Sequence, residues 1–480
     1  MPDTLKKQTI TGVFWSGLER FSVQGVTFLV QLVLARLLTP NEYGLIGMLV
    51  VFLQIGQVFI DSGFANALIQ KKECTPADFA TVFYYNLLLS LAIYAILFFT
   101  APFIASFYNQ DILIPLLRLL SLTLIINALA IVQKTILVKR VDFRTQTKVS
   151  LFSAILSGII GISLASKSFG VWALCWQQIS FSFLQLFFYT LYVHWLPNSK
   201  FSKESFIKLF NFGSKLLISS LISVIYKNLY SVVIGKKFTA AELGYYTRAE
   251  QFAMFPSNNL GNIIARVAFP IFSKIQDDTP KLCTAYRRII QYSSYIIFPL
   301  MCGLIAIAEP LITVLLTEKW LGIVPLLQIL CIDWMLDHLS IINLNLLYVK
   351  GRSDWALRLE IIKKIIAIII LIATIPFGLT IMCWGRVLYS IIATIINTHY
   401  TRILINLNFF QQMIDIIPYL IGALVMAAIV YGVNLLISTS ISQVIIGMLI
   451  GVIIYAIITF ICYKGIRTRL ICYIKNRKRE

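Results

Sequence analysis

The sequence predicts an all-α protein that crosses a membrane about fourteen times. Hydrophobic residues make up 59% and charged residues 13% of the 480 residues, and the mean hydropathy is +0.83. Soluble domains are about half apolar and about a quarter charged, so this composition excludes a soluble globular protein. Apolar runs that approach the ~20 residues needed for a bilayer-spanning helix recur along the whole chain. A segment near the start also recurs near the middle, which predicts two related halves.

Apolar runs that qualify as transmembrane helices occupy most of the chain. In order they cover residues 12–38, 44–69, 79–105, 114–138, 149–166, 170–193, 210–234, 244–272, 285–308, 320–349, 356–375, 379–398, 414–437 and 441–463. A polar link at 196–209, which contains Pro197 and several lysines, separates the sixth run from the seventh. We therefore expect the first domain to cover residues 1–195 and the second to begin at residue 210.

The first two runs carry polar residues on one helical face, although hydrocarbon disfavours such groups. A charge at the bilayer centre costs ~2.5–3.5 kcal/mol, so these side chains are expected to face other helices or water. Two interpretations remain open: the polar faces hold helices together, or they line a polar cavity. The residues, at helical offsets, are Arg20, Gln24, Thr27 and Gln31 in the first run and Gln54, Gln57 and Asp61 in the second.

The turn between these two runs recurs in the second half of the chain. Residues 35–44 align with residues 235–244 without gaps, and threonine, glutamate and glycine occupy the same places in both. Thr27 and Gln31, which precede the aligned segment, correspond to Lys227 and Ser231. The polar face therefore recurs together with the turn, as expected when a transporter is built from two repeats around a central site.

The net charge of +20 does not indicate nucleic-acid binding, because the basic residues lie at the ends of the apolar runs. With the N-terminus in the cytoplasm, the inner links and the tail at 464–480 hold most of the lysines and arginines. This distribution follows the positive-inside rule and predicts that both termini are cytoplasmic.

The sequence lacks the characteristic residues of several classes of enzyme. The sequence has no GxxxxGK[ST] phosphate loop, so we do not expect it to hydrolyse ATP. The predicted outer loops are short and contain no paired carboxylates for glycosyl transfer. Eight scattered cysteines and three histidines form no metal-binding pattern, so no metal site and no cofactor are expected. These observations leave transport driven by something other than a nucleotide.

Several motifs in the sequence resemble those of one transporter family. Residues 34–44 resemble the first outer turn, and residues 61–72 the end of the second helix, of the Wzx-type polysaccharide flippases. Further similar stretches are 234–236, 243–246 and 315–320. The resemblance implies the multidrug/oligosaccharidyl-lipid/polysaccharide exporter superfamily, with two six-helix lobes that would be 1–195 and 210–400. An additional helix pair would occupy 401–463, and a basic cytoplasmic tail 464–480.

The resemblance also implies a substrate: an oligosaccharide linked to undecaprenyl pyrophosphate, moved across the bacterial inner membrane. Cations would hold the pyrophosphate, and neutral polar groups would contact the sugars. The predicted substrate-binding residues are Arg20, Gln24, Gln31, Gln57, Lys215, Lys227, Asn228 and Arg248, with Gln54 and Asn258 as further sugar contacts. For Lys215 the alternative is a snorkelling lysine at the interface. For Arg248 it is a surface salt bridge with Glu250 or Glu242.

Intramembrane carboxylates supply candidates for coupling to H⁺ or Na⁺. These candidates are Glu19, Asp61, Asp333 and Asp337. Asp333 and Asp337 lie four residues apart on one helical face, and simple helix packing is the alternative role for both.

The leading hypothesis is therefore a flippase for lipid-linked oligosaccharides that works by alternating access. Its expected partners are the glycan substrate, the bilayer and the polysaccharide polymerase machinery, with no nucleic acid. The alternative within the same superfamily is a multidrug cation antiporter, which would favour acidic and aromatic cavity residues over Arg and Lys. A membrane glycan polymerase or ligase is a third class, disfavoured by the short outer loops.

Overall fold

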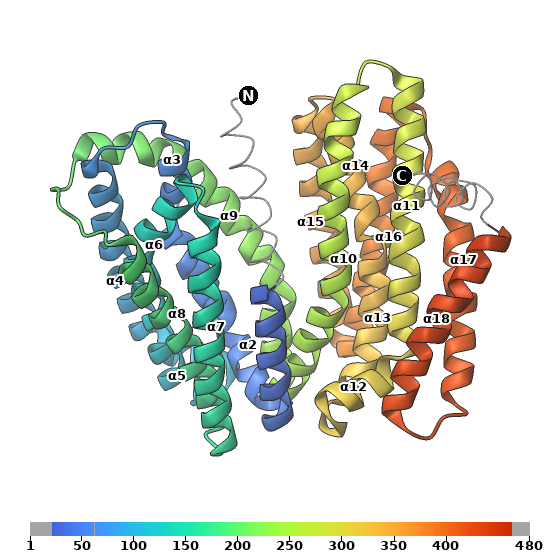
Figure 1. Ribbon diagram of the computed structural model, residues 1–480, viewed down its shortest axis with the longest axis horizontal. Helices are drawn as coiled ribbons and strands as arrows, with labels where there is room; N and C mark the ends of the chain where they lie inside the picture. Colours follow the sequence, from blue (N-terminus) through green and yellow to red (C-terminus); the bar gives the residue numbers. More distant parts are fainter. Residues whose placement is uncertain (1–21, 62, 463–480) are drawn as a thin grey trace, which may run out of the picture. The chain divides into compact units, whose positions relative to one another are not determined.

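The computed structural model describes residues 22–61 and 63–462. Its described residues form α-helices joined by short links and two 3-10 turns, without any β-strand. The chain divides into two compact units, which meet in the sequence between Gly244 and Tyr245 (Figure 1). We refer to them as unit 1 and unit 2. The expected lobe boundaries, with a linker at 196–209, stay a prediction.

Unit 1 begins, within the described residues, with the helix Ser22–Leu37. Side chains at the helix starts satisfy the free backbone N–H groups: Thr75 and Asp78 form a capping box, and Ser202 accepts from Ser205 N. The remaining helices are α2 (Pro40–Asp61), α3 (Phe64–Gln70), α4 (Pro76–Tyr108), α5 (Leu113–Leu120), α6 (Leu122–Lys139), α7 (Phe143–Ser166), α8 (Val171–Val193) and α9 (Lys203–Lys237).

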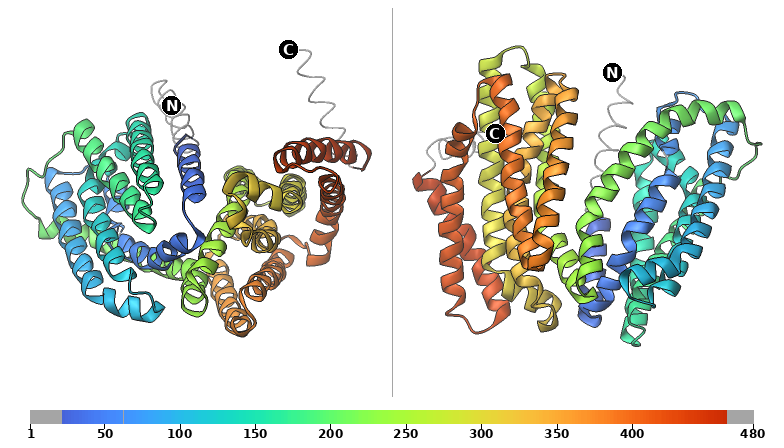
Figure 2. Two further views of the ribbon diagram at one scale, coloured as in Figure 1. Left: turned by 90° about the horizontal axis from the view of Figure 1, so that it is seen from below. Right: turned by 180° about the vertical axis from the view of Figure 1, so that it is seen from behind.

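Unit 2 contains most of α10 and all the helices that follow it. Within this unit α11 and α17 run side by side and α18 packs against α17 (Figure 2). The elements are α10 (Ala240–Lys274), α11 (Thr279–Ala306), α12 (Ala308–Leu316), η1 (Glu318–Trp320), α13 (Ile323–Met335), α14 (Asp337–Val349), α15 (Ser353–Thr374), η2 (Ile375–Phe377), α16 (Leu379–Ile405), α17 (Phe409–Asn434) and α18 (Ser440–Cys462).

The structure confirms the all-helical membrane class, because each predicted run is mainly helical over its described part. The runs 44–69, 114–138 and 320–349 are divided between consecutive helices. Eleven helical segments of the described chain are long and apolar enough to cross a membrane. Three predicted runs are not among these eleven: the described part of the first, which is short, and the more polar helices α10 and α15. The total of about fourteen spans therefore stays a prediction.

The second predicted run, 44–69, is wrong as a single continuous helix. The helix is interrupted between α2 and α3, where Gly63 adopts the left-handed backbone region at φ 70°. A Cβ atom on Gly63 would lie 2.7 Å from the Cα and the carbonyl oxygen of Gly213 in α9. The two glycines therefore let the interrupted segment and α9 approach closely, which no larger residue would allow.

The repeated turn noticed in the sequence folds in the same way twice. Thr39 N donates to Glu42 Oε2 at 2.6 Å, and Thr239 N donates to Glu242 Oε2 at 2.9 Å. Each glutamate thus satisfies the backbone N–H of the threonine before its helix, as in a capping box. The predicted local equivalence of these two turns is confirmed.

The two repeated helix starts also contact each other within unit 1. A Cβ on Gly44 would lie 1.6 Å from the carbonyl oxygen of Ala240, and one on Gly244 would lie 2.0 Å from that of Pro40. Backbone therefore packs directly on backbone in a reciprocal arrangement. This contact explains why glycine occupies the same place in both copies of the repeat.

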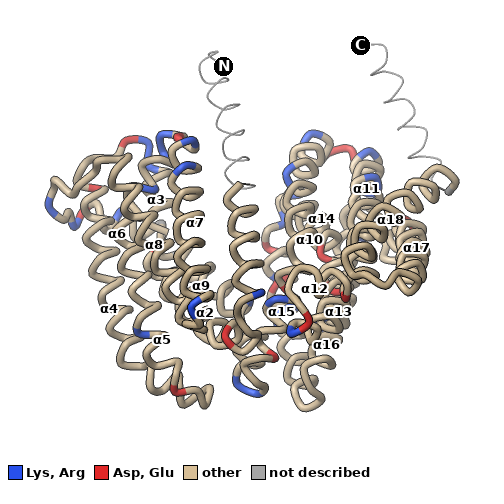
Figure 3. The backbone as a smooth tube through the Cα atoms, turned by 60° about the horizontal axis from the view of Figure 1, so that its bottom comes forward, with Lys and Arg blue, Asp and Glu red and all other residues tan. Residues whose placement is uncertain are grey.

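Many lysine and arginine residues lie at one end of each unit (Figure 3). In unit 1 they lie on the links that follow α3, α6 and α8, including Lys71 and Arg140. In unit 2 they lie at the end of α10, in the first turns of α11 and on the link that follows α14, including Lys274 and Arg352. These are the links that the sequence assigned to the cytoplasmic side.

Candidate functional site

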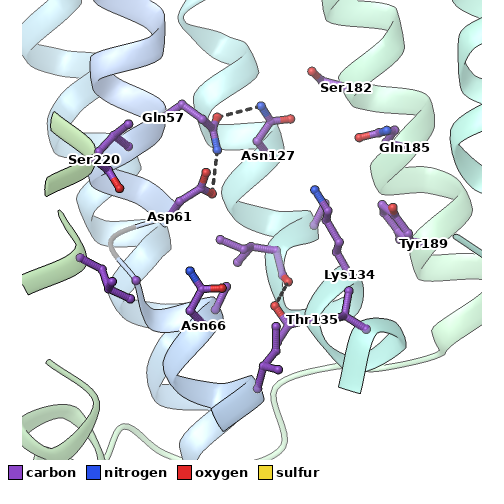
Figure 4. A pocket seen from close by; sticks show the side chains of 18 of the residues that line it. Gln57, Asp61, Asn66, Asn127, Lys134, Thr135, Ser182, Gln185, Tyr189 and Ser220 are labelled. Atoms are coloured by element: carbon purple, nitrogen blue, oxygen red, sulfur yellow. Dashed lines mark hydrogen bonds between the residues drawn. The ribbon is translucent and has the colours of Figure 1, made fainter. Parts of the chain in front are cut away.

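A polar cavity of about 780 Å³ lies inside unit 1. Helices α2, α3, α6, α8 and α9 form its walls (Figure 4). Its polar lining residues are Gln57, Asp61, Asn66, Asn127, Lys134, Thr135, Gln178, Ser182, Gln185, Tyr189 and Ser220. Eleven of the 21 residues that line the cavity are therefore polar, although the helices that build it are largely apolar.

The wall from α2 supplies Gln57 and Asp61, two residues predicted from the sequence. They lie four residues apart, one above the other on the same helix face. Gln57 Nε2 donates to Asp61 Oδ1 at 3.0 Å, and Asn127 Nδ2 of α6 donates to Gln57 Oε1 at 3.0 Å. This chain of hydrogen bonds fixes all three side chains against the cavity.

Lys134 on α6 was not predicted from the sequence, although it is a cation in a predicted membrane run. It lies seven residues, two helical turns, after Asn127, so both residues share the cavity face. Figure 4 shows its ammonium between Asp61 on one wall and Gln185 on the other. Within the described part of the chain, Lys134 forms no ion pair or hydrogen bond. Its charge is therefore available to a molecule in the cavity.

The wall from α8 forms a polar stripe that was also missed. Gln178, Ser182, Gln185 and Tyr189 follow at offsets of four, seven and eleven residues, which places them on one face of a helix. All four line the cavity. The same rule that found the polar faces of the first two runs would have found this stripe.

Two further predicted residues meet elsewhere in unit 1. Asn228 Nδ2 of α9 donates to Gln54 Oε1 of α2 at 2.7 Å and to the carbonyl oxygen of Val224 at 2.9 Å. Asn228 is buried. This pair joins two helices, which corresponds to the packing interpretation of the polar faces.

The other predicted residues of unit 1 have separate positions. Gln24 and Gln31 lie partly exposed on the helix Ser22–Leu37, and Lys227 is exposed on α9. For Lys215 the structure describes only the backbone, within α9. Glu19 and Arg20 lie outside the described residues.

In unit 2, Asp333 belongs to a buried charge network around Arg386, a residue that was not predicted. Arg386 Nε donates to Asp333 Oδ2 at 3.0 Å, and Arg386 Nη1 lies 2.7 Å from Glu250 Oε1. The Arg386 guanidinium also donates to the Tyr246 hydroxyl, and Ser390 donates to Asp333. Arg386 is therefore shared by Asp333 and Glu250, and it lies three helices after Asp333 in the sequence.

Asp337 has different surroundings, at a smaller cavity of about 260 Å³ in unit 2. Lys363 Nζ and Glu360 Oε1, which line the same cavity, form an ion pair at 2.5 Å. Asp337 forms no hydrogen bond or ion pair with any described residue. The remaining predicted cation, Arg248, donates to Gln251 on its own helix α10, and Asn258 accepts from Asn262.

The fold and the cavity together define a multi-pass helical membrane protein. Residues 33–325, more than half of the chain, match the model of a family described as polysaccharide biosynthesis protein. The chain belongs to this family, which confirms the resemblance seen in the sequence.

Proteins of similar sequence match most of the chain. The teichuronic acid biosynthesis protein TuaB of Bacillus subtilis (strain 168) is 27% identical to this chain, in an alignment that covers 90% of both proteins. The lipopolysaccharide biosynthesis protein WzxC of Escherichia coli (strain K12) is 28% identical over 82% of this chain and 81% of its own. The solved structure of the lipid II flippase MurJ in an inward closed conformation superposes with a TM-score of 0.76 at 16% identity. This match covers 95% of this chain and 99% of that one, so the two proteins share a fold.

Proposed function

We propose that this protein moves a lipid-linked oligosaccharide across the bacterial inner membrane by alternating access, acting as a transporter and not as an enzyme. Membership of a polysaccharide biosynthesis family and a fold shared with a lipid II flippase support this function. The observation that carries it is the polar cavity of about 780 Å³ among helices long enough to cross a bilayer. A sugar head group that leaves water needs hydrogen-bonding groups to replace its hydration, and the cavity offers them.

The proposed substrate carries its glycan on undecaprenyl pyrophosphate. Phosphate oxygens are held best by fixed cations. The basic residues proposed for this role are Arg20, Lys215, Lys227 and Arg248. The exposure of Lys227 on α9 supports its assignment.

Translocation is proposed to be coupled to H⁺ or Na⁺. Asp337 is the preferred coupling residue, because its carboxylate borders a cavity and has no partner among the described residues. Asp61 is a candidate for H⁺ coupling alone, since Lys134 in the same cavity disfavours a metal cation. Asp333 is a weaker candidate, since Arg386 already compensates its charge. Glu19 remains a candidate on the strength of the sequence alone.

Both termini are proposed to lie in the cytoplasm. The gathering of basic residues at one end of each unit supports this orientation, because cytoplasmic loops are enriched in Lys and Arg. Delivery of the glycan to the polysaccharide polymerase machinery on the other side of the membrane is part of the same proposal.

Deleting the gene in its own host tests the function. We expect loss of the surface glycan and accumulation of its lipid-linked intermediate on the cytoplasmic leaflet, both reversed by the wild-type gene. The double variant Arg20→Ala/Lys227→Ala should restore export poorly, whereas Lys148→Ala, at an exposed position on α7, should restore it fully. Normal glycan export in the deletion strain, with altered sensitivity to cationic drugs, would instead support the multidrug antiporter.

A further inference from the structure

We propose that the cavity inside unit 1 is a recognition subsite for an uncharged sugar ring of the transported glycan. In this subsite Asp61 accepts hydrogen bonds from ring hydroxyls and Lys134 donates to ring oxygens. The assignment rests on the proposed function for the source of the sugar. The volume of about 780 Å³ falls within the ~300–1,000 Å³ typical of pockets for small molecules.

The hydrogen bonds along one wall orient the groups that face the cavity. Asn127 donates to Gln57, and Gln57 donates to Asp61 Oδ1. The chain therefore ends on a carboxylate whose Oδ2 has no partner among the described residues. A carboxylate offers about four lone-pair sites on two oxygens, so Asp61 retains the capacity to accept two hydroxyl groups from adjacent carbons of a sugar.

The charges of the lining select against other ligands. Among the described lining residues, Asp61 and Lys134 are the only ionised groups, and their charges cancel. Pyrophosphate would meet the repulsion of Asp61 with a single cation to compensate it. A metal cation would meet the ammonium of Lys134 in the same space. An uncharged polyol can bind the carboxylate and the ammonium at once, and it introduces no net charge.

The opposite wall completes a surface for hydroxyl groups. Gln178 and Gln185 each present an amide donor and an amide acceptor, and Ser182 adds a hydroxyl that can do both. In Figure 4 Gln185 and Ser182 face Asp61 and Lys134 across the cavity. A sugar ring carries donors and acceptors around its whole edge, so both walls can bind the same ring.

The probe for this proposal is the oligosaccharide repeat released by mild acid from the host's own lipid-linked intermediate. Its binding to the purified full-length protein in nanodiscs is measured by saturation-transfer NMR and by titration. The matched probe is the same oligosaccharide after periodate treatment, which cleaves bonds between carbons that carry adjacent hydroxyls. Inorganic pyrophosphate is the third probe. We expect the intact oligosaccharide to bind and the periodate-treated one to bind much more weakly.

Two charge-removing variants then locate the binding. Asp61→Asn and Lys134→Met should each weaken binding of the oligosaccharide about tenfold or more, since each removes a charged hydrogen-bonding partner. Lys148 is an exposed lysine on α7 outside the cavity, so Lys148→Met should bind the oligosaccharide with wild-type affinity. Gln185→Ala provides a neutral test of the opposite wall if a charge variant fails to fold. Wild-type affinity in all three cavity variants would overturn the proposal, as would pyrophosphate binding that only Lys134→Met abolishes.

Export measured in parallel separates this proposal from the proposed function. If the wild-type gene restores export while the purified protein does not bind the oligosaccharide through this cavity, the subsite is wrong and the flippase function stands. If the wild-type gene does not restore export, the flippase function is wrong. In that case, binding of the intact and the periodate-treated oligosaccharide to the wild type and the variants still decides whether the cavity binds sugars.

Discussion

Adding a single methyl group at Gly44 tests the reciprocal contact between the two repeated helix starts in unit 1. The Cβ of Gly44→Ala would lie 1.6 Å from the carbonyl oxygen of Ala240, whereas ordinary contact begins near 3.4 Å. The obstructing atom belongs to the backbone, so no side-chain rotation relieves the overlap. The two helix starts must separate by about 1.4 Å before the distance reaches even 3.0 Å.

The magnitude follows from two opposing effects. Overpacking costs ~1–3 kcal/mol, and a contact between backbones belongs at the upper end of that range. Alanine recovers ~1 kcal/mol relative to glycine inside a helix. The net destabilisation is therefore about 2 kcal/mol, which lowers the melting temperature of a unit of this size by ~4–8 °C.

The assay is thermal unfolding of the purified protein, followed by fluorescence-detected size exclusion. Gly25→Ala is the matched control, because Gly25 lies in the helix Ser22–Leu37 of the same unit and no atom of the described residues lies within 4 Å of its Cβ position. The melting temperature of Gly25→Ala should be unchanged or slightly higher than that of the wild type. The melting temperature of Gly244→Ala should fall as much as that of Gly44→Ala. The double variant should lose less than the sum of the two decreases, since both changes disrupt one contact. Equal melting temperatures for Gly44→Ala and Gly25→Ala would refute the reasoning.

The remaining predictions concern polar groups inside the bundle. Asp333→Ala should destabilise unit 2 by about 2 kcal/mol, because Arg386 and Ser390 lose hydrogen bonds to a carboxylate while Glu250 still balances the charge of Arg386; denaturation in detergent, compared with the exposed control Asp354→Ala, measures this loss. A double-mutant cycle on Gln54 and Asn228 should give a coupling of about 0.6 kcal/mol, the average for hydrogen bonds between membrane helices, and zero coupling would mean that their hydrogen bond is absent in the bilayer. Asp337→Asn should make export in vesicles insensitive to protonophores or to sodium replacement, and an unchanged sensitivity would remove this residue from the coupling mechanism.

Much of the fold could be predicted because the relevant rules are local. The bilayer sets the length of each helix, so apolar run length alone located the helices. The repeated turn could also be predicted, since Thr39 and Glu42 interact across three residues, as do Thr239 and Glu242. The interruption of the second run at Gly63 was missed. It depends on Gly213, which lies in a different helix far along the chain.

The candidate site was predicted in part. The polar face of the second run correctly indicated that Gln57 and Asp61 point at a polar environment. Lys134 and the α8 stripe follow the same periodicity, but which helix faces meet at a cavity depends on the packing of α2, α6 and α8, which residue spacing does not show. The pairing of Asp333 with Arg386 could not be read from spacing, since 53 residues separate them and the interaction forms only when α13 and α16 pack.

Asp61 and Asp333 show when a charged residue in a membrane helix indicates a functional site. Both were selected by the same argument, that a carboxylate in a membrane helix needs compensation. The structure compensates Asp333 with a guanidinium and a hydroxyl, so its charge is accounted for by packing. Among the described residues a single amide donates to Asp61, which otherwise faces a cavity that also holds the ammonium of Lys134. A charge inside a membrane therefore indicates function only when the surrounding protein leaves its hydrogen-bonding capacity unused. By that criterion Asp61 in the cavity of unit 1 and Asp337 at the smaller cavity of unit 2 are carboxylates with which a polar ligand can still form hydrogen bonds.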